Sequence, residues 1–102
     1  MKKQIGRKYD TGKTTFWFLP WEAINAIARV MMHGADKYEV DNWKYVKPPL
    51  RYVDALYRHL NLWCSGEKID KDSGLPHLAH VGCNAIFIIW LELKGVLKCP
   101  KR

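Results

Sequence analysis

The sequence predicts an all-α protein, a compact bundle of about three to four helices. One segment is rich in helix-forming residues, a second carries apolar residues at helical spacing, and a third is apolar on every side. No stretch alternates apolar and polar residues with the period of two that marks a strand. The 102 residues, 48% of them hydrophobic, suffice for one core. We therefore expect a single domain over residues 1–102, with a basic arm at 1–18 and a basic tail at 94–102.

The first helix is expected to begin at Pro20 and to end before Gly34. Proline suits the first helical position, and glycine is the residue that most often ends a helix. Glu22 shares one face with Asn25 and Arg29, which is usually just the solvent face of a helix. Glu22 also lies in the first turn, where the helix dipole favours an ionised carboxylate. It is therefore a candidate ligand for a divalent cation.

The second helix is expected over residues 50–64, after a connecting loop that ends in two consecutive prolines. One stripe of this helix should face the core, and His59 within it is interpreted as a core histidine: Tyr52, Leu56, His59 and Trp63. The other stripe is polar: Arg51, Asp54, Arg58 and Asn61. Asp54 and Arg58 have the spacing of an ordinary helical ion pair. The same stripe offers a carboxylate for a cation and guanidinium groups for phosphate.

The third helix is expected to begin at Pro76 and to continue to about residue 93. It is apolar on all sides except for the late Glu92 and a line formed by His77, His80 and Asn84. A helix that is apolar all around is buried all around, either at the centre of a bundle or at a subunit interface. Buried polar side chains need partners, so this line should face polar residues of other helices, a metal or a ligand.

Two further segments are candidates for binding. The N-terminal GRKYDTGKT lacks the glycine spacing and the preceding strand of a phosphate-binding P-loop, and it is either a flexible basic arm or an anion-binding segment containing Lys8 and Lys13. The loop before the third helix holds Glu67 and Asp70 in an E-x-x-D spacing that does not match a calcium-binding EF-hand. It is either a solvated loop or part of a metal site.

The net charge of +7 favours a partner that carries phosphates: nucleic acid, an anionic membrane surface or a nucleotide. The three cysteines form no C-x-x-C pair, which argues against a disulfide framework and a zinc knuckle and favours a reducing compartment. The sequence shows no signal peptide and no apolar run long enough to span a bilayer. We expect a cytoplasmic protein with no membrane partner.

Several motifs in fixed order also resemble a known family: GRKYDTGK, FLP with a following Glu-Ala, HGADKYEVDNW, DALYRHL and GEKIDKDSGLPHLAHVGCNAIF. This set, from Gly6 to about Leu93, is similar to small phage and prophage proteins described as dATP/dGTP diphosphohydrolases of the MazZ type. Those proteins are similar in turn to the all-α MazG-like nucleoside triphosphate pyrophosphohydrolases.

The resemblance implies a MazG-like helical enzyme, completed by oligomerisation to a dimer or tetramer and active in the host cytoplasm if phage-encoded. It implies that Mg²⁺ or Mn²⁺ assists cleavage of dATP or dGTP between the α and β phosphates, giving the monophosphate and pyrophosphate. The wider class carries its metal on E-x-x-E and E-x-x-D motifs of facing helices. Here Glu22 with Asn25, and His77 with His80, stand at those spacings, so the identity of the metal ligands stays open.

Together, these patterns predict three sets of site residues. The expected metal ligands are Glu22, Asp54, Glu67 and Asp70. The expected catalytic residues are Glu22, Asp54, His77 and His80. The expected substrate-binding residues are Lys8, Lys13, Lys37, Tyr38, Asn42, Trp43, Arg51, Arg58 and Asn84, the basic ones for phosphate and Tyr38, Asn42 and Trp43 for the base.

Three alternatives stay open at this point. The chain could be a basic nucleic-acid-binding module without catalysis, although nucleic acid is not the expected partner. It could be a metal phosphohydrolase that releases phosphate, built on Asp54, His59, His77 and His80. It could also be a scaffold without chemistry.

Overall fold

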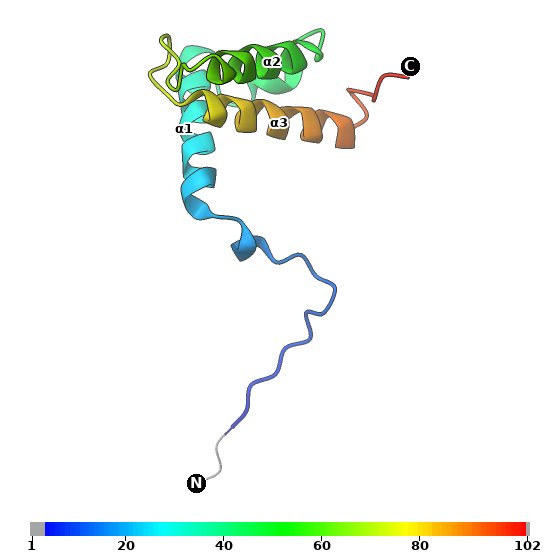
Figure 1. Ribbon diagram of the computed structural model, residues 1–102. Coiled ribbons are helices and arrows are strands. Elements are labelled where there is room, and N and C mark those ends of the chain that lie inside the picture. Colours follow the sequence, from blue (N-terminus) through cyan, green and yellow to red (C-terminus); the bar gives the residue numbers. More distant parts are fainter. Residues whose placement is uncertain (1–3, 102) are drawn as a thin grey trace.

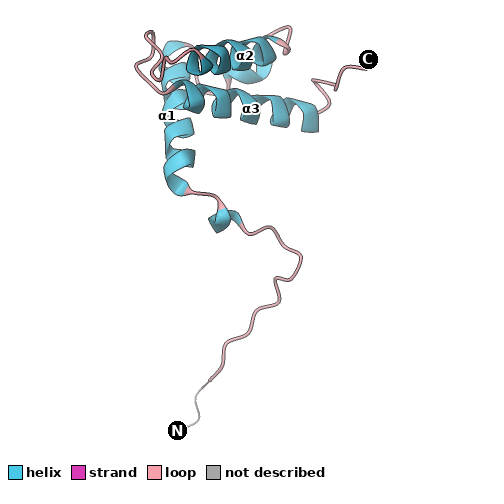
Figure 2. Cartoon of the chain, viewed as in Figure 1, coloured by secondary structure: helices cyan, strands magenta, loops and turns pink. Residues whose placement is uncertain are grey.

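The computed structural model describes residues 4–101; residues 1–3 and 102, the extreme ends of the predicted arm and tail, lie outside the described residues. The described residues form three α-helices and two short 3-10 helices: η1 (Phe16–Phe18), α1 (Trp21–Lys37), η2 (Asn42–Tyr45), α2 (Arg51–Cys64) and α3 (His77–Leu93). Residues 4–101 contain no strand (Figure 2), and their one strand-like feature is an isolated bridge between Ile69 and Pro76. The predicted all-α bundle is confirmed.

The helices α2 and α3 lie side by side as an antiparallel hairpin, and the C-terminal part of α1 crosses one end of this pair (Figure 1). The N-terminal part of α1 and the segment before it lead away from the pair (Figure 1). The crossing has a direct consequence: residues at the start of α1 stand far from the hairpin.

The end of α1 differs from the prediction. Gly34 lies inside the helix, which continues for three more residues to Lys37, and the N–H of Tyr38 donates to the carbonyl of Gly34 at 2.9 Å. Gly34 does not end the helix, because Ala35 and its neighbours continue the backbone hydrogen bonds beyond it. The extra turn carries Lys37 to the rim of the pocket described below.

The core lies between α1 and α3. Val30, Ala79 and Cys83 are buried there, and partly buried apolar side chains surround them: Ala26, Ile27, Met31, Leu75 and Phe87. Gly82 makes the close approach possible, because a Cβ at this position would stand 2.7 Å from Cδ1 of Ile27. The absence of a side chain at Gly82 therefore brings the two helices together.

Aromatic side chains fix the segment between α1 and α2 onto α3. The ring of Trp43 stacks on Phe87 with centroids 4.3 Å apart, and its edge meets Trp90 at 5.1 Å. The hydroxyl of Tyr52 donates to the carbonyl of Trp43 at 2.9 Å. This cluster builds one wall of the pocket.

Of the two placements expected for α3, the first, at the centre of the bundle and covered on all sides, is wrong for the single chain. Leu78, Ile89 and Leu93 are exposed, with Leu93 78% accessible. Two neighbouring helices cover only part of its circumference, as α1 crosses at one end. Trp63 is also exposed, contrary to its predicted place in the core stripe of α2. No helix among residues 4–101 is long and apolar enough to cross a membrane.

Candidate functional site

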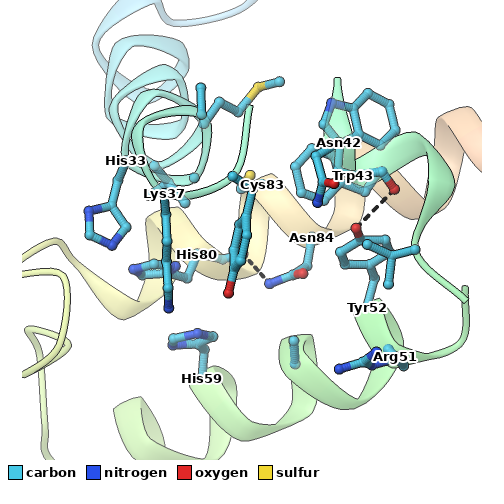
Figure 3. Close-up of a pocket in the computed structure, with 18 of the residues that line it drawn as sticks. His33, Lys37, Asn42, Trp43, Arg51, Tyr52, His59, His80, Cys83 and Asn84 are labelled. Atoms are coloured by element: carbon cyan, nitrogen blue, oxygen red, sulfur yellow. Dashed lines mark hydrogen bonds between the residues drawn. The ribbon is translucent and has the colours of Figure 1, made fainter. Parts of the chain in front are cut away.

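A pocket of about 540 Å³ lies between the C-terminal part of α1, the segment that contains η2, and the facing sides of α2 and α3 (Figure 3). Many of the predicted site residues line it: Lys37, Tyr38, Asn42, Trp43, Arg51, Arg58, His80 and Asn84. From α1, His33 and Lys37 point toward the side of the pocket that holds His59 and His80 (Figure 3). The structure thus brings together residues from four separate segments of the chain.

The charge of this pocket favours an anion. Lys37, Arg51 and Arg58 line it, and Glu39 is the one carboxylate residue among the described residues that do so. Arg51 and Arg58 stand on the same helix, two turns apart, and both are exposed. Guanidinium groups bind phosphate or carboxylate through paired hydrogen bonds, so these two residues can grip an anionic ligand along its length.

A cluster of histidines and carboxylates adjoins the pocket. The Nδ1 atoms of His59 on α2 and His77 on α3 are 2.8 Å apart. The other ring nitrogen of His77, Nε2, is 2.6 Å from Oε2 of Glu67 in the loop between the helices. His77 is fully buried. Its ring is therefore held between an imidazole and a carboxylate.

A serine organises the second half of the cluster. The hydroxyl of Ser73 and the backbone N–H of the same residue both donate to Oδ2 of Asp70, at 2.7 and 3.0 Å. Because the hydroxyl proton is used there, the short contact of 2.7 Å to Nε2 of His80 places the proton on His80, which donates to Ser73. The ring of His80 also stacks on that of His59 at 4.2 Å.

Backbone hydrogen bonds hold the loop in this shape. The N–H of Asp70 donates to the carbonyl of Leu75, and the N–H of His77 donates to that of Lys68. Gly74 makes the turn with φ of 71°, which favours glycine. The loop is thus an ordered element that presents Glu67 and Asp70 to the start of α3, and it is not merely a solvated connection.

These surroundings set the protonation of the cluster. Burial lowers the pKa of His80 to about 4 and also lowers the pKa of His59, so both rings are neutral at pH 7. The hydrogen bond from His77 lowers the pKa of Glu67. Burial acts to raise the pKa of Asp70, but the hydrogen bonds from Ser73 and the nearby histidines outweigh it and the net shift is downward. Neutral imidazoles beside ionised carboxylates are the forms that bind a divalent metal.

Other predicted residues lie elsewhere. Glu22 is exposed in the first turn of α1 and borders a separate hollow lined by residues 16–22 and 24. Asp54 is exposed on α2 and does not line the pocket. Lys8 and Lys13 belong to the arm, which leads away from the helices (Figure 1). The four carboxylates expected to share a metal are therefore split, with only Glu67 and Asp70 in one place.

The family of the chain follows from comparison with known proteins. The family described as "dATP/dGTP diphosphohydrolase, N-terminal" matches residues 3–100. The chain belongs to this family. The dATP/dGTP diphosphohydrolase of Salmonella phage PMBT28 is 34% identical over 86 residues, which cover 84% of this chain and 29% of the relative. The chain thus spans less than a third of that relative's length, and no solved structure is significantly similar to it.

Within this family member, the sequence pattern gives one residue of the site mainly a structural role and misses another. His59 is interpreted above as a core histidine and joins a site only in the phosphohydrolase alternative, yet it lines the pocket and contacts both His77 and His80. Ser73, which joins Asp70 to His80, was not predicted at all. The D-x-x-S spacing typical of an Asx-type turn was the available signal for Ser73.

The buried thiol of Cys83, at the back of the pocket, provides a test of the fold. Burial raises its pKa to about 11, whereas Cys64 and Cys99 are exposed. Thiolate is the reactive form, so iodoacetamide at pH 8 should add two groups to the native chain and three to the chain in urea, as read by intact mass and peptide mapping. Labelling of Cys83 in the native chain to the same extent as Cys64 and Cys99 would contradict its burial.

Proposed function

We propose that this chain binds a purine deoxyribonucleoside triphosphate, dATP or dGTP, in the pocket and hydrolyses it with Mg²⁺ or Mn²⁺ to the monophosphate and pyrophosphate. The observation that carries this proposal is a pocket of about 540 Å³ lined by Lys37, Arg51 and Arg58 with one aromatic wall. That volume lies within the range of small-molecule sites. The name of the phage relative, dATP/dGTP diphosphohydrolase, supplies the substrate class.

The lining suggests how the nucleotide is held. Arg51 and Arg58 form hydrogen bonds to the phosphate oxygens, while Lys37 contributes a charge from the opposite side. Trp43 is fixed by its stacking on Phe87 and forms a rigid wall for the base. The exposed Tyr38 and Asn42 beside it supply a further ring and an amide for hydrogen bonding.

The cluster in which Glu67 and Asp70 meet the histidines offers ligand atoms that fit a divalent cation. Glu22 and Asp54 lie elsewhere and do not join this cluster. A cation bound there would neutralise charge on the triphosphate and lower the pKa of a water molecule. His80 remains neutral and oriented by its hydrogen bond to Ser73. The role of His80 is to form the pocket wall beside the cation and to accept a hydrogen bond at Nδ1.

The test is product analysis. The purified chain is incubated with each of the (d)NTPs in the presence of Mg²⁺ or Mn²⁺, and the products are separated by ion-exchange chromatography. We expect monophosphate and pyrophosphate in equal amounts from dATP or dGTP, and none after addition of EDTA. Absence of turnover, together with saturable dNTP binding, would reduce this chain to the binding portion of a longer enzyme. Absence of both would overturn the proposal.

A second candidate is the His/Asp phosphohydrolase, which the convergence of His59 and His77 with a carboxylate favours. The carboxylate is Asp70, since Asp54 lies elsewhere. The same chromatogram separates the two candidates, because this enzyme releases inorganic phosphate and leaves a diphosphate.

We further propose that the chain acts in the cytoplasm as a homo-oligomer, a dimer or tetramer. The support is the apolar surface of α3, where Ile86, Ile89 and Leu93 are exposed on the single chain. Exposed apolar side chains grouped on one element are typical of surfaces that another chain covers.

A further inference from the structure

We propose that His59, His77 and Asp70 form a binding site for a divalent transition-metal ion of the Zn²⁺ type, with Glu67 positioning His77. Among residues 4–101, these three are the one group of His, Cys, Asp or Glu whose ligand atoms converge, all within 4.8 Å of one another. They come from α2, α3 and the ordered loop between them. This inference rests on the proposed function in that it names the ligands of the cation expected there, and its test measures metal binding without nucleotide, so its failure is distinguishable from a failure of hydrolysis.

The tautomer of His77 points its free electron pair toward the proposed ion. Glu67 accepts a hydrogen bond from Nε2 at 2.6 Å, so in the tautomer that can bind a metal the proton resides on Nε2 and the electron pair of Nδ1 is free. This Nδ1 atom faces Nδ1 of His59. A carboxylate that accepts from the outer nitrogen of a histidine is the usual support of a metal-bound imidazole.

The contact between the two histidines marks the place of the ion. Without a metal, one proton must lie between the two Nδ1 atoms, which are 2.8 Å apart. A metal with Zn–N bonds of about 2.0–2.1 Å in tetrahedral geometry separates two nitrogens by roughly 3.3 Å. An ion can therefore take the place of that proton if the rings part by about half an ångström, and the proton of the neutral His59 ring then moves to its Nε2 atom.

The ligand set indicates the kind of metal. Two imidazole nitrogens and one carboxylate suit Zn²⁺, Mn²⁺, Fe²⁺ or Co²⁺, whereas Mg²⁺ prefers oxygen ligands alone. Three protein ligands also leave one position open, as in catalytic zinc sites. His59 lines the pocket, so the site adjoins the space proposed for the nucleotide.

A competing explanation is a purely structural hydrogen-bond network. Every buried polar side-chain atom within residues 4–101 already has a partner, so the cluster is satisfied without an ion. The two explanations differ in what added metal does. A network needs no metal and gains nothing from it, while a metal site binds one ion per chain and stabilises the fold.

The test uses the full chain after treatment with chelator, titrated with Zn²⁺, Mn²⁺ and Mg²⁺ by calorimetry and followed by thermal unfolding. We expect one Zn²⁺ per chain, a rise in Tm and weaker binding of Mg²⁺. His59→Ala and Asp70→Asn should each weaken Zn²⁺ binding by roughly a hundredfold or more. Glu67→Gln should weaken it by about 10–100-fold, because it removes only the support of His77.

Two matched controls keep the result specific. His33→Ala changes an exposed histidine at the pocket, and Asp72→Asn changes an exposed aspartate of the same loop; both should bind Zn²⁺ as the unchanged chain does. Far-UV circular dichroism identifies any variant that fails to fold, and Asp70→Asn preserves the shape of the side chain. Binding that is absent, or that persists in His59→Ala and Asp70→Asn, would overturn the proposal.

Discussion

Replacement of both Arg51 and Arg58 by alanine should weaken the binding of dATP or dGTP by at least about a hundredfold. Hydrogen bonds to charged groups contribute about 1.5–3 kcal/mol each, and every 1.4 kcal/mol is about tenfold in affinity. Both side chains line the pocket and are exposed, so their loss should leave the fold intact. Calorimetric titration of the nucleotide, without added metal, measures the effect.

The control for this double variant removes two positive charges elsewhere. Arg29→Ala combined with Lys98→Ala changes the net charge equally, and neither residue lines the pocket. We expect a change of less than about threefold, because exposed charges at a distance are screened by salt. Equal weakening in both double variants would show that general attraction to the basic chain, and not the pocket, governs binding.

Leu91→Ala should lower the free energy of unfolding by about 2–5 kcal/mol, the usual cost of truncating a buried leucine. Leu91 is 1% exposed, and its carbonyl accepts hydrogen bonds from the N–H groups of Val96 and Leu97, which fold the chain back at the end of α3. A domain of this size loses about 4–8 °C of Tm per kcal/mol, so the transition should fall by about 8 °C or more. Urea and thermal unfolding followed by circular dichroism give both values.

Leu93→Ala, two residues along the same helix but 78% exposed, distinguishes a monomer from the proposed homo-oligomer. In a monomer it should change stability by no more than about 0.5 kcal/mol. A large loss that grows on dilution would instead mean that a second copy covers this face of α3. No loss with Leu91→Ala would contradict the packing at the end of α3.

Local signals in the sequence defined the hairpin well. The Ser65–Gly66 pair and Pro76 mark the end of α2 and the start of α3, because each changes the backbone where it stands. The polar line of α3 also showed that His77 and His80 needed partners. Periodicity identifies which face of a helix is unusual, but it does not identify what that face meets.

The partners themselves depended on tertiary structure. The sequence predicts that the polar line of α3 faces polar residues of the other helices, a metal or a ligand, whereas His77 bonds to His59 from the core stripe of α2 and to Glu67 from the loop. Glu22 was included on the strength of the helix dipole, a local effect that carries no information about how α1 crosses the hairpin. Because α1 crosses α3 at Gly82, the start of α1, which carries Glu22, lies away from the other carboxylates.

The short separation of the cluster along the chain affects how the protein reaches its fold. His59 and His77 are only 18 positions apart along the sequence, and the hydrogen bonds that shape the loop join residues that are even closer in sequence. Closing such a small loop costs little entropy and is fast, so the α2–α3 hairpin can assemble its histidines before α1 docks. The ligand-binding chemistry would then be present in the earliest ordered unit, and α1 would arrive last to close the pocket over it.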